Sequence, residues 1–182
     1  MRGLMVPGLN GSGPEHWQTL WEKKYAFERV EQRDWDRPAV EDWVRTLDAA
    51  ITRQADKAVL IAHSLGCCTA VRWVERFPAH RDRVLALFLV APPDIATSQA
   101  IPASAQGFAL EDPQALPFPS LLVGSENDPY MDLEKARALA TALESRFVNA
   151  GPAGHINVDS GHGPWPKGES WLRELRVLAE GG

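Results

Sequence analysis

Cysteine is scarce in this sequence of 182 residues. Its two cysteines, Cys67 and Cys68, are adjacent, and neighbouring cysteines cannot form a disulfide without strain. Two cysteines also provide no framework of disulfides, which excludes a small disulfide-stabilised secreted domain. We therefore expect a reducing, cytoplasmic environment, in which both side chains pack as small apolar fillers.

A long hydrophobic run is also missing. The N-terminal residues are apolar only until Pro7 and Gly8, which is too short for a signal sequence or a membrane span. The net charge is −5 and no basic stripe is present, so neither a membrane nor nucleic acid is expected as a partner. No cluster of histidine, cysteine and carboxylate residues has the spacing of a metal site, and we expect neither a metal nor another cofactor.

The chain does contain an alternation of strand-like and helix-like segments. Its length and its apolar content of 45% favour a single domain, residues 1–182, with a sizeable core. The alternation predicts an α/β fold with a doubly wound, mainly parallel sheet whose helices cover both faces. We expect a loop over residues 94–118. The predicted strands are residues 3–6, 27–30, 57–62, 83–90, 120–123 and 146–149, and the predicted helices are residues 15–25, 37–53, 67–77, 133–143 and 170–178.

The most informative segment is Ala62-His63-Ser64-Leu65-Gly66. It joins an apolar, β-branched run to a helix-patterned run and places a serine between small residues at the junction. This is the pattern of a nucleophile elbow, G-x-S-x-G, with alanine in place of the first glycine. The sharp turn crowds the positions two before and two after the serine, so both must be small. Taken alone, the segment is equally compatible with a helix cap.

Residues with matching chemistry follow other predicted strands. In a parallel sheet the ligand site lies beyond the carboxyl ends of the strands. Ser64 follows the third strand, Asp128 lies in the loop after the fifth, and His155 follows the sixth. Nucleophile, acid and base therefore occur in the chain order of the α/β-hydrolases. We predict that these three residues form a catalytic triad.

The chemistry of a triad needs these residue types. A serine hydroxyl is a weak nucleophile until a base takes its proton, and a neutral imidazole can take it at neutral pH. The carboxylate fixes the imidazole tautomer. The developing oxyanion needs backbone N–H donors, which we assign to Leu65 and to Leu9 in the glycine-rich loop 7–13. Asn10 is the alternative to Leu9.

Other residues compete for the roles of base and acid. His162 is the second candidate for the base, although only His155 comes directly after the last strand. The competitors of Asp128 are Glu126, Asp94 and Asp132, of which Asp132 is expected to cap the following helix.

The substrate pocket is expected to include Asn10, His162 and Trp165. Trp17 and Trp35 also fall near the same side of the sheet, and these tryptophans either wall the pocket or belong to the core. The remaining histidines are interpreted as structural, with His63 packed in the interior and with His16 and His80 at the surface or capping a helix.

Several segments resemble the signatures of small serine hydrolases akin to retinoblastoma-binding protein 9, and the resemblance covers nearly the whole chain. The segments are Val6-Pro7-Gly8, Gly13-Pro14-Glu15-His16-Trp17-Gln18, Trp35-Asp36-Arg37-Pro38, Asp42-Trp43, Ala62-His63-Ser64-Leu65-Gly66, Leu116-Pro117-Phe118-Pro119-Ser120, Asn127-Asp128-Pro129-Tyr130, Gly154-His155-Ile156-Asn157 and Gly163-Pro164-Trp165-Pro166.

The resemblance implies an α/β-hydrolase fold with a six-stranded sheet of order 2-1-3-4-5-6 and no cap domain. It implies hydrolysis of small esters, amides or thioesters by Ser64, Asp128 and His155. The alternative is a non-catalytic protein-binding module on the same scaffold. The human relative's retinoblastoma-binding motif, L-x-C-x-E, ends in Thr69 here, so that protein partner is not carried over.

Overall fold

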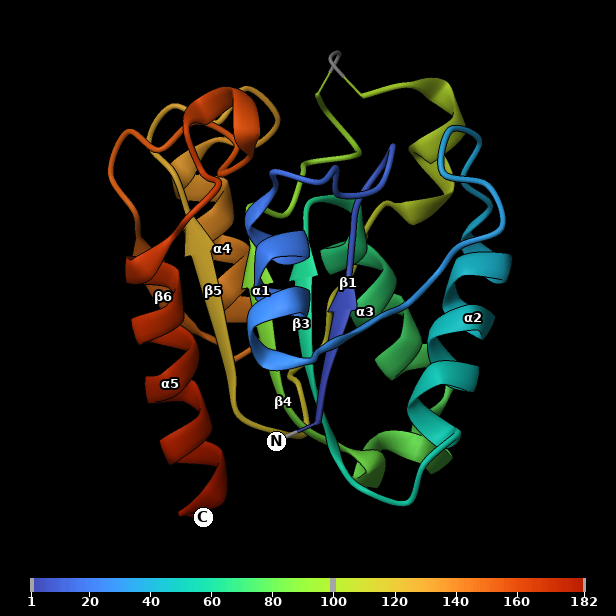
Figure 1. The fold of residues 1–182 in the computed structure, drawn as a ribbon. Coiled ribbons are helices and arrows are strands. Elements are labelled where there is room, and N and C mark those ends of the chain that lie inside the picture. The colour runs from blue at the N-terminus through green and yellow to red at the C-terminus, as the bar shows by residue number, and fades with distance from the viewer. Residues whose placement is uncertain (1, 99–100, 182) are drawn as a thin grey trace.

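Six parallel strands form one sheet in the order β2-β1-β3-β4-β5-β6 (Figure 1). This computed structural model describes residues 2–98 and 101–181. The strand order is the one predicted for an α/β-hydrolase fold, and the prediction is confirmed. The strands are β1 (Arg2–Val6), β2 (Glu28–Arg29), β3 (Ala58–His63), β4 (Val84–Val90), β5 (Ser120–Gly124) and β6 (Arg146–Asn149).

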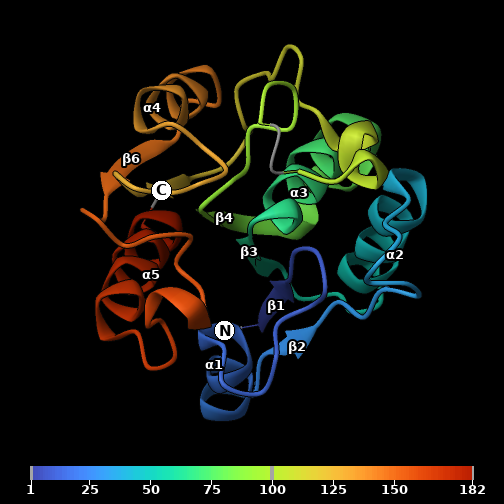
Figure 2. The ribbon, with the colours of Figure 1, turned by 90° about the horizontal axis from the view of Figure 1, so that it is seen from above.

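The central strands are apolar because helices cover both of their faces. In β3, Leu60 packs into the core on one face and Ile61 into the core on the other, and both are fully buried. Figure 2 shows α2 (Val40–Thr52), α3 (Leu65–Arg76) and α4 (Leu133–Ala142) on one side of the sheet. The other side carries α1 (Trp17–Tyr25) and α5 (Pro166–Glu180).

Local sequence signals account for most helix boundaries. In α2, Trp43, Leu47 and Ile51 recur at helical spacing, and all three are buried as predicted. Leu47 and Ile51 pack in the core on the sheet, whereas Trp43 packs in a smaller cluster with Leu65 and Phe108. At the start of α4, the Asp132 carboxylate accepts hydrogen bonds from the N–H groups of Glu134 and Lys135, so the predicted cap is confirmed.

The last helix begins four residues earlier than predicted. Pro166 occupies the first turn of α5, where the missing N–H costs nothing. Gly168 also lies inside the helix. A glycine is needed at this position because a Cβ would lie 2.2 Å from the Trp165 ring. The glycine and proline before residue 170 therefore mark close packing and a helix start, although neither residue type favours a helix interior.

The connection from β4 to β5 holds the segment that was expected as a loop. Within its described part, a short 3₁₀ helix, η2 (Ala103–Phe108), packs near α3 and is the one regular element. Two more 3₁₀ helices follow α3 and β6, namely η1 (Pro78–Arg83) and η3 (Val158–Ser160). Across residues 2–98 and 101–181, no helix combines the length and apolarity needed to cross a membrane.

The two cysteines are buried and unbridged, which confirms that they pack as apolar fillers. The Cys67 thiol donates to the Val90 carbonyl at 3.3 Å. Burial raises the pKa of the Cys68 thiol to about 12, so this thiol stays protonated at neutral pH and is a poor nucleophile.

Candidate active site

Ser64 lies in a strained turn between β3 and α3. Its backbone has φ 53° and ψ −127°, and a positive φ is costly for any residue with a side chain. The turn brings α3 so close to β1 that a Cβ on Gly66 would lie 2.0 Å from the Val6 carbonyl oxygen. Two positions before the serine, Ala62 is fully buried beside Val6 in β1 and Leu89 in β4. Packing therefore requires glycine at position 66, and Ala62 fills a fully buried position on the other side of the serine.

Ser64, His155 and Asp128 lie in one hydrogen-bonded row at the carboxyl edge of the sheet. The Ser64 hydroxyl lies 2.8 Å from His155 Nε2. On the other side of the ring, Nδ1 lies 3.0 Å from each carboxylate oxygen of Asp128. Because a carboxylate only accepts, Nδ1 carries the proton and Nε2 accepts from the serine. The Asp128 side chain is 2% exposed and that of His155 is 10% exposed, so bulk water screens this pair weakly.

The loops that carry the acid and the base are tied together. Asn127 Oδ1 accepts from the Gly154 N–H at 2.7 Å, directly before His155. Ser125 Oγ accepts from the Ala153 N–H at 3.0 Å, and the Glu126 N–H donates to the Gly151 carbonyl at 2.9 Å. These hydrogen bonds fix the position of the loop that carries Asp128 relative to the loop that carries His155. Sequence analysis missed Ser125 and Asn127, because small polar residues of a loop carry no sign of their partners.

The glycine-rich loop after β1 packs against the elbow. A Cβ on Gly8 would lie 2.8 Å from the Ser64 Cβ and 3.0 Å from the Leu65 nitrogen. The Asn10 N–H donates to the Trp35 carbonyl at 3.1 Å, so this donor is already engaged. Neither the Leu9 N–H nor the Leu65 N–H finds an acceptor among the described residues. Leu9 and Leu65 thus offer two free donors beside the serine.

A cavity of about 350 Å³ opens above Ser64. It includes the predicted Leu9, Asn10, Leu65 and His155 together with residues that sequence analysis did not assign to the site. The latter come from the end of β3, from the loops after β4, β5 and β6 and from the start of α1, and they include His63, Pro93, Ile95, Ile101, Pro102, Ala105, Tyr130, Asn157, Asp159 and His16.

Trp165 and His162 do not line this cavity, which corrects the expectation for both. Trp165 is 6% exposed and stacks on Trp21 with ring centroids 5.8 Å apart, deep in the core between α1 and α5. His162 bonds to the Ser160 hydroxyl at 3.1 Å, and partial burial lowers its pKa. Trp17 is likewise a core residue at 0% exposure. Half-buried Trp35 packs near Leu9 behind the loop, without lining the cavity.

Two buried histidines support the site. His63 Nε2 lies 2.9 Å from the His155 carbonyl oxygen, and because a carbonyl only accepts, Nε2 carries the proton. Burial holds the pKa of His63 well below its ordinary value, so its ring is neutral. His16 Nδ1 accepts from the Gln18 N–H at 3.2 Å and caps α1, and burial lowers the pKa of His16 to about 4. The predicted capping role of His16 and packing of His63 are confirmed, but their place beside the triad was missed.

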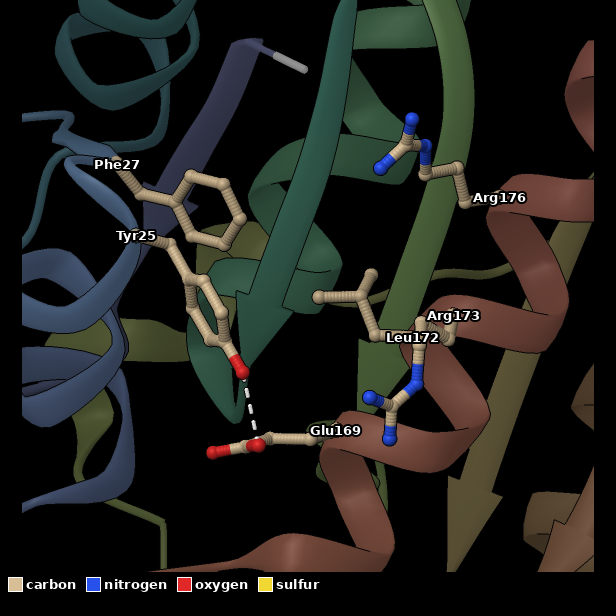
Figure 3. A pocket seen from close by; sticks show the side chains of 6 residues that line it. All are labelled: Tyr25, Phe27, Glu169, Leu172, Arg173 and Arg176. Atoms are coloured by element: carbon tan, nitrogen blue, oxygen red, sulfur yellow. Dashed lines mark hydrogen bonds between the residues drawn. The ribbon is translucent and has the colours of Figure 1, made fainter.

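A second cavity, of about 280 Å³, lies between the end of α1 and α5 (Figure 3). Its lining includes Phe27 and Leu172, and the Tyr25 hydroxyl donates to Glu169 at 2.8 Å across its edge. Arg173 and Arg176 complete the lining. None of these lining residues pairs a nucleophile with a base, so the cavity above Ser64 is the candidate for chemistry.

Comparison with known proteins adds independent findings. The profile of a family described as serine hydrolase matches residues 3–174 of the chain. A solved YdeN-like hydrolase from Pectobacterium atrosepticum is 31% identical with a TM-score of 0.85, over 98% of this chain and 91% of that one. No curated protein sequence matches the chain.

Two further solved structures share the fold at lower identity. The ydeN gene product of B. subtilis is 18% identical with a TM-score of 0.79, over 96% of this chain and 98% of that one. Est1E from Butyrivibrio proteoclasticus, solved with bound ferulic acid, is 14% identical with a TM-score of 0.69, over 97% of this chain and 86% of that one. At these identities the similarity extends to the fold alone.

Proposed function

Because the chain belongs to the serine hydrolase family, we propose that it hydrolyses small carboxylic esters with Ser64, His155 and Asp128 as its catalytic triad. The observation that carries the proposal is the row of hydrogen bonds from the Ser64 hydroxyl through the His155 ring to the Asp128 carboxylate. The same machinery serves small amides and thioesters, since all three substrates pass through a tetrahedral oxyanion.

The proposed reaction uses the hydrogen-bonded atoms of Ser64, His155 and Asp128 in turn. Ser64 Oγ attacks the ester carbonyl carbon while His155 Nε2 takes the hydroxyl proton. The Leu9 and Leu65 N–H groups stabilise the oxyanion, and Asp128 stabilises the imidazolium that forms. The intermediate then expels the alcohol, which receives the proton from Nε2. Water, deprotonated by His155, attacks the acyl-serine and regenerates the hydroxyl of Ser64.

The first test is the Ser64→Ala variant. We expect its rate of ester hydrolysis to fall by on the order of 10⁴- to 10⁶-fold, because the variant lacks the attacking hydroxyl. For the same reason, we expect it to lose labelling by a fluorophosphonate probe. p-Nitrophenyl acetate turnover and mass spectrometry of the labelled peptide measure both effects. Ser104→Ala, an exposed serine in η2, is the matched control and should retain both activities. Wild-type turnover by Ser64→Ala would refute the proposal.

The second test separates the two candidate bases. His155→Ala is expected to be as damaging as Ser64→Ala, and the double variant should resemble either single one because the residues act as a unit. His162→Ala should retain most activity, since His162 bonds to Ser160 rather than to Ser64. The same ester assay measures these variants. Loss of turnover in His162→Ala alone would show that the base is assigned to the wrong histidine.

A further inference from the structure

The walls of the cavity above Ser64 differ in polarity. One wall comes from the connection between β4 and β5 and is apolar, with Ile95 and Ala105 nearly fully buried in a cluster that includes Leu65. Another wall comes from the chain just after His155 and is polar, with Asn157 and Asp159 facing the same cavity. The substrate therefore meets an apolar surface on one side and a polar, acidic surface on the other.

The charge of the cavity is negative. Asp159 is exposed, and no hydrogen bond or ion pair links its carboxylate to another described residue. Of the described residues that line the cavity, none is lysine or arginine. Burial lowers the pKa of His16 to about 4, and it also holds the pKa of His63 well below its ordinary value, so neither ring adds positive charge at pH 7. The Asp128 carboxylate behind His155 adds a second negative group.

The proton that His155 returns to the leaving alcohol determines on which side of the site this alcohol lies. His155 Nε2 must return its proton to the departing oxygen, so that oxygen leaves on the side of the His155 ring. Asn157 and Asp159 lie two and four residues beyond His155, where the chain turns into η3. The proposed reaction thus sets the alcohol portion of the substrate on the side of His155, in the cavity that Asn157 and Asp159 also line.

We propose that Asp159 is a specificity-determining residue that selects esters whose leaving alcohol carries a positive charge, such as an amino alcohol or a quaternary ammonium alcohol. The inference rests on the proposed function and names the substrate class of that site. A charge about 5 to 7 Å from an exposed carboxylate gains a preference of about threefold in water, and up to about tenfold where the cavity wall limits screening. The same carboxylates disfavour anionic substrates.

The test compares two esters of equal shape. Propionylcholine carries a quaternary nitrogen, and 3,3-dimethylbutyl propionate carries a carbon in its place. We expect wild-type kcat/KM to favour the choline ester by about threefold to tenfold, and the preference to weaken at high salt. Asp159→Asn should bring the ratio close to one, because it lowers kcat/KM for the choline ester more than kcat/KM for the neutral ester. Glu111→Gln removes an exposed charge that does not line the cavity and should leave the ratio unchanged.

A third substrate is a methyl ester with a quaternary nitrogen on its acyl portion. It tests whether Asp159 recognises a positive charge only on the alcohol portion. We expect Asp159→Asn to lower kcat/KM for this ester less than it lowers kcat/KM for propionylcholine. An equal loss on this substrate, or an unchanged choline preference in Asp159→Asn, would overturn the inference. Hydrolysis of the neutral ester that depends on Ser64 would then still support the proposed function. If wild type hydrolyses neither ester and does not label at Ser64, the proposed function and the inference both fail.

Discussion

His63 links the strand of the nucleophile to the base. It precedes Ser64, and its Nε2–H bonds to the backbone oxygen of His155 across 92 residues of chain. The ring centroids of His63 and His155 lie 5.0 Å apart, and those of His63 and His16 lie 4.8 Å apart. His63 does not reach the reacting atoms in this arrangement. We therefore regard it as a positioning residue that acts through the backbone of His155.

We predict that His63→Phe lowers kcat by about 10- to 100-fold with a smaller change in KM, because a buried carbonyl loses its donor and the base shifts. His63→Gln keeps an N–H donor and should recover part of the loss. Steady-state kinetics on one ester measure both variants, with His80→Gln as a control far from the cavity. A pure stability effect would lower the melting temperature and leave kcat per folded molecule unchanged.

At the residue scale, the hydrogen-bonded row of Ser64, His155 and Asp128 was predictable from chain order and strand ends. Leu9 and Asn10 could not be separated from sequence, because the hydrogen bond from Asn10 to Trp35 depends on how two distant loops pack. Trp165 was misplaced for a similar reason. A tryptophan beside a polar loop has the same sequence signal whether it faces a cavity or stacks on Trp21 in the core.

At the scale of elements, the cap of α1 makes stability depend on pH. The folded-state pKa of His16 is about 4, below the ordinary 6.5, because burial disfavours the charged ring. The unfolded chain therefore binds a proton first as pH falls, so stability is complete above pH 6.5 and declines between pH 6.5 and 4. The pKa of His63 is shifted in the same direction and adds to the decline.

We predict that His16→Asn loses less stability on acidification than wild type does. Asparagine can cap the helix but does not titrate, so the variant should be spared about 2 to 3 kcal/mol of the loss between pH 7 and 4.5. Urea denaturation at the two pH values measures the free energy of unfolding. Carboxylates contribute equally to both proteins and cancel in the comparison. Identical pH dependence of the two proteins would contradict the assignment.

The strand positions were the easiest part of the fold to predict. A short, continuous apolar run such as β4 is typical of a strand that is buried on both faces. Element ends were harder to predict. β2 pairs over only Glu28 and Arg29, and α5 contains Gly168, which propensity alone would exclude from a helix. Both departures come from tertiary contacts that no local pattern encodes.

At the scale of the whole molecule, the open cavity limits the acyl chain. The cavity holds about 350 Å³, shared between the acyl and alcohol portions of an ester. Each methylene that is buried gains about 0.8 kcal/mol, or about fourfold in binding. We predict that kcat/KM for p-nitrophenyl esters rises over the first few carbons and then levels off or declines. A steady rise as far as the palmitoyl ester would reveal a deep channel and contradict this prediction.

The apolar wall has a consequence for how such a protein changes over evolutionary time. Ile95, Ile101, Pro102 and Ala105 all come from one connection, the one between β4 and β5. Ser64, Asp128 and His155, the proposed nucleophile, acid and base, come from three other connections. Under the proposed function, acyl selectivity and bond breaking therefore depend on separate stretches of chain. Mutation or recombination within a single loop can retune what the protein accepts, while the atoms that perform the reaction keep their places.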